Sequence, residues 1–165
     1  MGMGDGKPAV YHLSRDDAEH FVFDEPFVVV SVTDPGATPL TFVPCEKRRA
    51  ILRLAFHDLD FAPEDVDVSS WVLYTKEHAK TIINFVLDWR YAVRLIVFSC
   101  EAGLSRSAAL AAAVAYGLLA DALPPRKGVP NRSVFLETLV TWAALQEGGM
   151  AHGRWHDPRM LEDHQ

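Results

Sequence analysis

The residues with the clearest chemistry lie in one short segment, Cys100 to Ser107, with the sequence CEAGLSRS. An apolar run from Leu95 to Phe98 precedes this segment, and an alanine-rich run from Ala108 to Ala115 follows it. This order predicts a strand, a tight loop and the first turn of a helix. Backbone N–H groups of such a loop converge on one point, where the helix dipole adds positive potential, so an anion can bind there.

Two side chains of the segment could act on a bound phosphate. Thiolates are favoured at helix N-termini and beside arginines, so Cys100 is a candidate nucleophile. The planar guanidinium of Arg106 can hold two phosphate oxygens at once. We therefore interpret the segment as a phosphate-binding loop that contains its own nucleophile.

Two other interpretations of this segment are weaker. A buried, inert cysteine at a strand end is common, but it leaves Arg106 at a helix start unexplained. Gly103 to Ser107 also comes within one residue of the Gly-x-Ser-x-Gly turn of serine hydrolases. That chemistry would need a base such as His152 or His156, and the second glycine of the turn is missing.

Length and composition limit the class of protein. The chain of 165 residues, 49% hydrophobic and 23% charged, is typical of one globular domain over residues 1–165. Residues 1–8 are expected to be a loose leader and residues 150–165 a polar tail. The net charge of −6 argues against nucleic acids and anionic membranes as partners, and no uninterrupted run of 18 apolar residues is present.

The use of cysteine indicates a reducing compartment. Cys45 and Cys100 are 55 positions apart, which fits neither a metal-binding pair nor a disulfide framework. The first six residues have no apolar core of a signal peptide. We therefore expect a cytoplasmic protein with a free thiol at position 100. On oxidation the two cysteines could also pair, although a plain thiol at position 45 is the simpler expectation.

Strands alternate with helices along the chain, which predicts an α/β fold with a central, mostly parallel sheet flanked by helices. The phosphate loop then lies between a strand end and a helix N-terminus. Ligands of such sheets bind beyond the carboxyl ends of the strands, where His57, Asp58 and Cys100 are expected to share a pocket. The expected strands are 27–32, 51–56 and 95–99; the expected helices are 70–90, 107–122, and 131 or 133 to 146; residues 34–36 are a turn and 61–68 a loop.

The segment from Cys100 to Arg106 resembles the Cys-x5-Arg signature of the protein tyrosine phosphatase superfamily. Ser107 and the alanines after it look like the dual-specificity branch. Pro130-Asn131, followed by the string from Phe135 to Leu139, is similar to the element that follows the loop in those enzymes. The likeness covers about residues 50–142 and is nearest to compact bacterial members.

The resemblance implies a phosphatase that works through a phosphocysteine, without a metal or other cofactor. Cys100 would attack phosphorus, and the hydroxyl of Ser107 would help the thiolate to depart in the second step. Gly103 would let the loop curl close to the phosphate. The substrate would be a phosphorylated protein or a small phosphomonoester. The phosphate oxygens would be held by Arg106 and by the backbone of Glu101, Ala102, Gly103, Leu104, Ser105 and Arg106.

Two residues depart from the pattern of that family. Ser99 stands where the family usually has a histidine that shapes the loop, which leaves open a weakly active or inactive phosphate-binding module. Ser99 could still hydrogen-bond within the loop. Glu101 adds a negative charge that disfavours highly anionic substrates, and the loop has no lysine of the kind seen in phosphoinositide-directed relatives. A phosphoprotein is therefore favoured over a lipid phosphate.

A phosphatase of this type also needs a carboxylic acid that protonates the leaving oxygen. Asp58 directly follows the strand that ends at Phe56 and His57, so it is our first candidate, and Asp60 is the second. Asp65 and Asp67 are nearer to the family's usual separation from the cysteine. We expect those two to lie near the start of the next helix and to offset its dipole.

Overall fold

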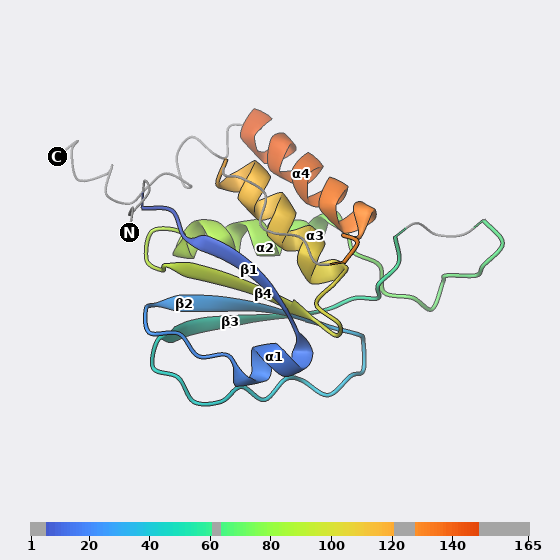
Figure 1. Ribbon diagram of the computed structural model, residues 1–165. Coiled ribbons are helices and arrows are strands. Elements are labelled where there is room, and N and C mark those ends of the chain that lie inside the picture. Colours follow the sequence, from blue (N-terminus) through green and yellow to red (C-terminus); the bar gives the residue numbers. More distant parts are fainter. Residues whose placement is uncertain (1–5, 61–63, 121–127, 149–165) are drawn as a thin grey trace.

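The protein folds as a four-stranded sheet between layers of helices (Figure 1). The computed structural model describes residues 6–60, 64–120 and 128–148. The elements, in chain order, are β1 (Ala9–Ser14), α1 (Arg15–His20), β2 (Phe27–Thr33), β3 (Arg48–Ala55), α2 (Lys76–Trp89), β4 (Leu95–Cys100), α3 (Arg106–Ala113), the π-helical turn η1 (Val114–Leu118) and α4 (Arg132–Glu147).

All neighbouring strands of the sheet are parallel, in the order β1-β4-β2-β3. The predicted α/β class is therefore confirmed. Every residue of β4 and all but the last of β2 are buried, because helices cover one face of these inner strands and the segment after α1 packs against the other. Parallel strands end at one edge of the sheet, so the segments that follow β2, β3 and β4 lie side by side there.

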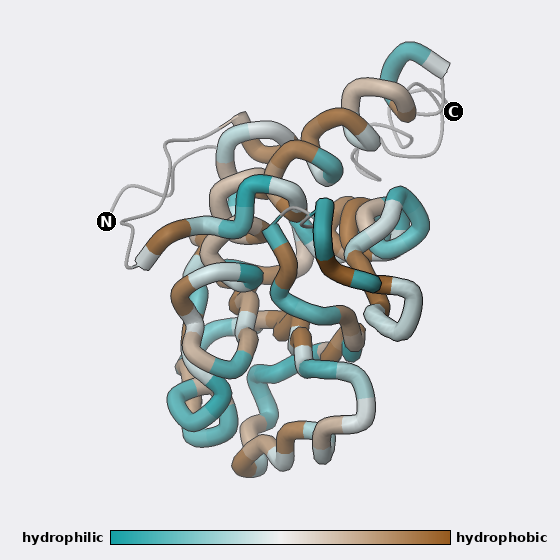
Figure 2. The backbone as a smooth tube through the Cα atoms, turned by 90° about the vertical axis from the view of Figure 1, so that its right-hand side faces the viewer, coloured by the Kyte–Doolittle hydropathy of each residue, from teal (hydrophilic) through white to brown (hydrophobic). Residues whose placement is uncertain are grey.

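The two faces of the sheet carry separate hydrophobic cores. The larger core packs α2, α3, η1 and α4 against one face, and the smaller core packs the aromatic segment after α1 against the other (Figure 1). Hydrophobic and hydrophilic stretches alternate along α4 in Figure 2, and the buried side chains of this helix are Val134, Thr138 and Thr141. Alternate residues of each strand serve alternate cores, so Cys100 belongs to the larger core and Leu95 and Val97 to the smaller.

The N-terminal elements β1 and α1 are absent from the sequence-based prediction. β1 is an edge strand with few buried residues, so it lacks the continuous apolar run that marks β2 and β4. Residues 6–8, which belong to the predicted leader, directly precede this strand. Ser14 accepts a hydrogen bond from the backbone N–H of Asp17 (3.2 Å) and thereby caps α1. The chain consequently enters its first helix beside the end of β4.

The predicted helix over residues 70–90 begins too early, because α2 starts only at Lys76. The N–H of Thr75 donates to Nδ1 of His78 (3.0 Å) and fixes that start. Before the helix, the backbone N–H of His57 donates to the carbonyl oxygen of Val72 (2.7 Å), and the backbone N–H of Val72 donates to Nδ1 of His57 (2.9 Å). These bonds hold residues 72–75 outside the helix, next to the end of β3.

The other helix predictions agree more closely with the structure. The helix expected over 107–122 starts at Arg106 and changes to a π-helical turn after Ala113. Asn131 caps α4 through its side chain, as one of the two expected starts requires. Residues 121–127 and 149–165, including His152 and His156, lie outside the described residues. None of the described helices is both long and apolar enough to cross a membrane.

Candidate active site

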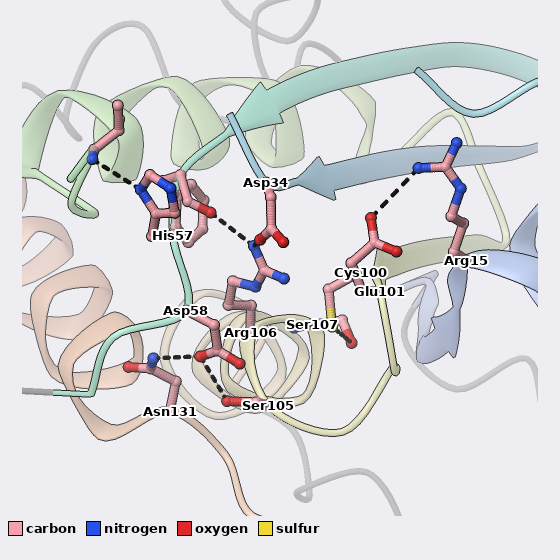
Figure 3. A network of polar contacts seen from close by, with 12 residues as sticks. Arg15, Asp34, His57, Asp58, Cys100, Glu101, Ser105, Arg106, Ser107 and Asn131 are labelled. Carbon is pink, nitrogen blue, oxygen red and sulfur yellow. Dashed lines mark hydrogen bonds and ion pairs between the residues drawn. The ribbon is translucent and has the colours of Figure 1, made fainter. Parts of the chain in front are cut away.

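Cys100 is the last residue of β4, and the loop after it leads into α3 (Figure 3). The cysteine is only 3% exposed. Its Sγ lies 3.1 Å from Oγ of Ser107 and accepts a hydrogen bond from the backbone N–H of Ser107 at 3.4 Å. Both contacts come from the first turn of a helix, where the dipole favours a negative charge. The sulfur is thus held at the start of α3, in contact with the hydroxyl and the backbone N–H of Ser107.

Arg106 is a buried arginine that has one buried nitrogen without a partner. Its Nη1 donates to Oδ1 of Asp34 and to the carbonyl oxygen of Phe56, both at 2.7 Å. Its Nε is buried and has no hydrogen-bond partner within the described part of the chain. A buried donor without a partner costs about 1–3 kcal/mol, and an anion in the loop would satisfy it. One end of the guanidinium is therefore fixed, and another donor remains for a phosphate oxygen.

Asp34 lies at the candidate site, although the sequence marks it only as the start of a turn. It begins the predicted turn over residues 34–36, and the N–H of Ala37 donates to its backbone oxygen (3.1 Å). Its side chain, however, forms the ion pair that orients Arg106 (Figure 3). An acid directly after a buried strand, beside the strand that carries the nucleophile, is the signal that could have identified it.

Asp34→Ala is expected to lower the free energy of unfolding by about 1–3 kcal/mol, because a buried guanidinium loses a charged acceptor. The loss stays below that of a fully buried pair, since the Asp34 side chain is 52% exposed. Asp34→Asn, which keeps an acceptor oxygen, should cost less. Urea unfolding measures both variants, with Glu25→Ala as control because its pair with Arg94 is exposed on both sides. Equal losses for Asp34→Ala and Glu25→Ala would contradict this role.

Asp58 is the acid that contacts the loop. Its Oδ1 accepts hydrogen bonds from Oγ of Ser105 (2.9 Å) and from Nδ2 of Asn131 (2.8 Å). The carboxylate therefore joins the end of β3, the phosphate loop and the start of α4 (Figure 3). Asn131, singled out in the sequence within the Pro-Asn element, thus acts twice, as the cap of α4 and as a partner of Asp58.

The other candidate acids have structural partners or lie apart from the loop. Asp60 accepts from the backbone N–H groups of Arg132 and Ser133 (2.6 and 3.1 Å) and so stabilises the start of α4. Asp67 accepts from the N–H of Ser69 (2.9 Å), which holds the pKa of that carboxyl below its usual value. The prediction that Asp65 and Asp67 offset a helix dipole is wrong, because α2 starts well beyond them, at Lys76.

Glu101 does not stand alone at the mouth of the loop. Its Oε1 lies 3.3 Å from Nη1 of Arg15, whose Nη2 donates to the carbonyl oxygen of Thr38 (2.6 Å). Figure 3 shows the two side chains turned toward each other. The backbone N–H of Arg15 also donates to the Glu101 carbonyl oxygen (3.2 Å). The start of α1 thus offsets the negative charge that Glu101 brings to the loop.

Ser99 faces away from the site. Residues of a strand alternate between faces, so the side chain of Ser99 points to the side opposite Cys100. Its Oγ is buried and finds no hydrogen-bond partner among residues 6–60, 64–120 and 128–148. The hydrogen bond that Ser99 could have formed within the loop is therefore absent from the described part of the chain.

The second cysteine lies on the other side of the sheet. Cys45 packs against the smaller core, whereas Cys100 belongs to the larger one. Both thiols are free, and a disulfide between them would require the sheet to come apart. Within the described ranges, no three side chains among His, Cys, Asp and Glu are grouped so that they could hold a metal ion.

Comparison with known proteins gives a limited result. No protein-family model matches the sequence, and no curated protein matches it. Among solved structures, the chain is similar to a mouse "putative dual specificity phosphatase" in complex with zinc tungstate. The two share 16% identity over 74% of each chain, with a TM-score of 0.48. Likeness at this level assigns no activity, so the function has to be argued from the residues of the site.

Proposed function

We propose that the protein is a cysteine-dependent phosphomonoester hydrolase of the protein tyrosine phosphatase type, with dual specificity. The observation that carries this proposal is the arrangement around the phosphate loop. The Cys100 sulfur contacts the hydroxyl and the backbone N–H of Ser107 at the start of a helix, and the buried Nε of Arg106 has no hydrogen-bond partner among the described residues. A bound phosphate would complete this site, and the sulfur would lie at its phosphorus.

In the first step, the Cys100 thiolate attacks phosphorus and forms an S–P bond while the ester O–P bond breaks. Asp58 gives its proton to the leaving oxygen, which departs as an alcohol or phenol. Arg106 and the loop N–H groups hold the remaining oxygens as their charge is redistributed. The ion pair with Asp34 keeps the guanidinium in place during this change.

In the second step, water attacks the phosphocysteine and releases inorganic phosphate. Asp58, now a carboxylate, accepts a proton from that water. The S–P bond breaks, and the electron pair returns to sulfur. The Ser107 hydroxyl, 3.1 Å from Sγ, donates a hydrogen bond to the returning thiolate. The cycle uses only groups of the chain and water.

The substrate we propose is a phosphorylated protein, or a small phosphomonoester. The segment from Cys100 to Ser107 has Arg106 as its one basic residue and contains no lysine, so it lacks the additional cations that a ligand with many phosphates would need. The negative net charge disfavours nucleic acids and anionic membranes. A free thiol nucleophile suits a reducing compartment, and we propose the cytoplasm.

Asp58→Asn is expected to lower kcat by about 10²-fold for phosphotyrosyl peptides, because the leaving phenol then departs without a proton. The loss should be smaller for aryl phosphates whose leaving phenol is acidic. Steady-state kinetics with both substrate types measure this difference. Asn still offers an oxygen to Ser105 and Asn131, so the loop should keep its shape. An equal loss for both substrates would contradict the role of general acid.

Asp60→Asn is the matched control for that experiment. Asp60 holds the start of α4 and makes no hydrogen bond to the loop within the described residues, so kcat should stay within about twofold. If Asp60→Asn shows the leaving-group dependence and Asp58→Asn does not, the proton comes from Asp60. That result would replace our first candidate with the second.

An inactive phosphate-binding module is the second candidate function, and Ser99 favours it. The family's loop-shaping histidine is missing, and the hydroxyl in its place makes no contact with the loop. Turnover of a chromogenic aryl phosphate separates the two functions. A wild-type protein that binds inorganic phosphate but releases no phenol would be a binding module, and steady release that depends on Cys100 would be a phosphatase.

A further inference from the structure

The strand β1 ends directly against the phosphate loop. His12 of β1 lies with its Nδ1 2.8 Å from the carbonyl oxygen of Gly103, which is a contact across 91 positions of the chain. A carbonyl oxygen only accepts, so Nδ1 carries the proton. Gly103 has a φ of +72°, and a Cβ added there would clash with the backbone N of Ser14. The loop is therefore pressed against β1 at a position where only glycine fits.

We propose that His12 is a positioning residue, which orients one of the N–H groups that bind phosphate. A peptide unit is planar and trans, so its C=O and N–H point in opposite directions. When His12 holds the Gly103 carbonyl on the β1 side, the N–H of Leu104 points away from β1. Glycine gives this peptide unusual freedom to turn over. Without the bond to His12, the unit could present a carbonyl oxygen to the anion in place of an N–H.

The peptides on either side are held in the same way. The carbonyl oxygen of Glu101 accepts from the N–H of Arg15, and that of Ser105 accepts from the N–H of Asn131, both at 3.2 Å. The Ser105 carbonyl also accepts from the N–H of Ala109 in α3 (2.9 Å). Alternate carbonyls of the loop are thus bound, and the N–H group of each of these peptide units points the other way. Of these bonds, the one at Gly103 depends on a side chain. It can therefore be removed by substitution.

His12→Leu is expected to weaken binding of inorganic phosphate by about tenfold, because one N–H bond to a charged oxygen is lost or misdirected. His12→Asn should restore binding to within about twofold of the wild type, since its amide N–H can donate from nearly the same place as Nδ1. His12→Gln, whose amide lies one bond farther out, should restore less. In turnover, KM should rise more than kcat falls for His12→Leu, and His12→Asn should reverse that change.

The chain offers a matched control in His20. Its Nδ1 also lies 2.8 Å from a backbone carbonyl oxygen, that of Asp16, but on the exposed helix α1. His20→Leu removes the same kind of bond without touching the loop, so phosphate affinity should stay at the wild-type value. Urea unfolding of each variant separates loss of fold from loss of binding.

Calorimetric titration of the wild type and these variants with inorganic phosphate tests the inference. Weaker binding by folded His12→Leu, rescue by His12→Asn and no change in His20→Leu are expected. Wild-type affinity in His12→Leu, or no rescue by Asn, would overturn it, as would a wild type that binds no phosphate. If His12→Leu does not fold, the phosphate affinities of His12→Asn and His12→Gln are compared instead, and tighter binding by His12→Asn is the expected result. The inference rests on one part of the proposed function, the binding of phosphate. A wild type that binds phosphate without turnover would contradict the proposed phosphatase activity, but it would leave the role of His12 unchanged.

Discussion

Cys100→Ser is expected to abolish turnover, with a loss of at least about 10⁴-fold in kcat, because no other group of the site can form the covalent intermediate. The variant should keep its affinity for phosphate, since the loop, Arg106 and Ser107 are unchanged. Hydrolysis of a chromogenic aryl phosphate measures the loss, and titration with inorganic phosphate measures the binding.

Cys45→Ser provides the control for a general effect of losing a thiol. Cys45 is half-buried on the opposite side of the sheet, so its substitution should change kcat by no more than about twofold. Full activity of Cys100→Ser would end the proposal of cysteine chemistry. So would a loss that Cys45→Ser reproduces.

Arg106→Lys is expected to lower kcat/KM by about 10²–10³-fold, the range seen when one donor to a developing charge is removed. Arg106 uses Nη1 for Asp34 and Phe56 and keeps Nε for the anion. A lysine has one charged nitrogen on a flexible stem and cannot serve both sides with a fixed geometry. The charge is retained, so the loss would measure geometry and not charge.

The same conservative change at Arg94 is the control. Arg94 forms an exposed pair with Glu25 far from the loop in the fold, at the start of β4, so Arg94→Lys should leave kcat/KM within about twofold. Equal activity of Arg106→Lys and the wild type would mean that a point charge is enough, which contradicts the assigned role of the guanidinium.

The parts of the fold that the sequence predicts are those with strong local signals. β2 and β4 are continuous apolar runs, and their burial on both faces of the sheet explains why they stand out. The signal for the loop is also local, because the eight consecutive residues from Cys100 to Ser107 contain a strand end, a glycine, an arginine and a helix start. Asp58 follows from the rule that ligands bind at the carboxyl ends of parallel strands.

The parts that the sequence does not predict depend on contacts between distant segments. β1 is a short edge strand, and its pairing with β4 gives no apolar run to recognise. Asp34 has the sequence context of a turn, and only the meeting of the β2 and β4 ends shows it beside Arg106. His12 lies 91 positions from Gly103, so its contact follows from the register of β1 on β4. The predicted start of α2 is wrong because tertiary hydrogen bonds between His57 and Val72 hold residues 72–75 outside the helix.

The central claim is that catalysis passes through a phosphoryl group on sulfur, and rapid acid quenching of a single turnover tests it most directly. The wild type should yield a phosphorylated peptide that contains Cys100, formed within the first turnover and lost as phosphate is released. The peptide that contains Cys45 should stay unmodified, and Cys100→Ser should give no thiophosphate. Turnover without any phosphocysteine, or equal labelling of the two cysteines, would contradict the account.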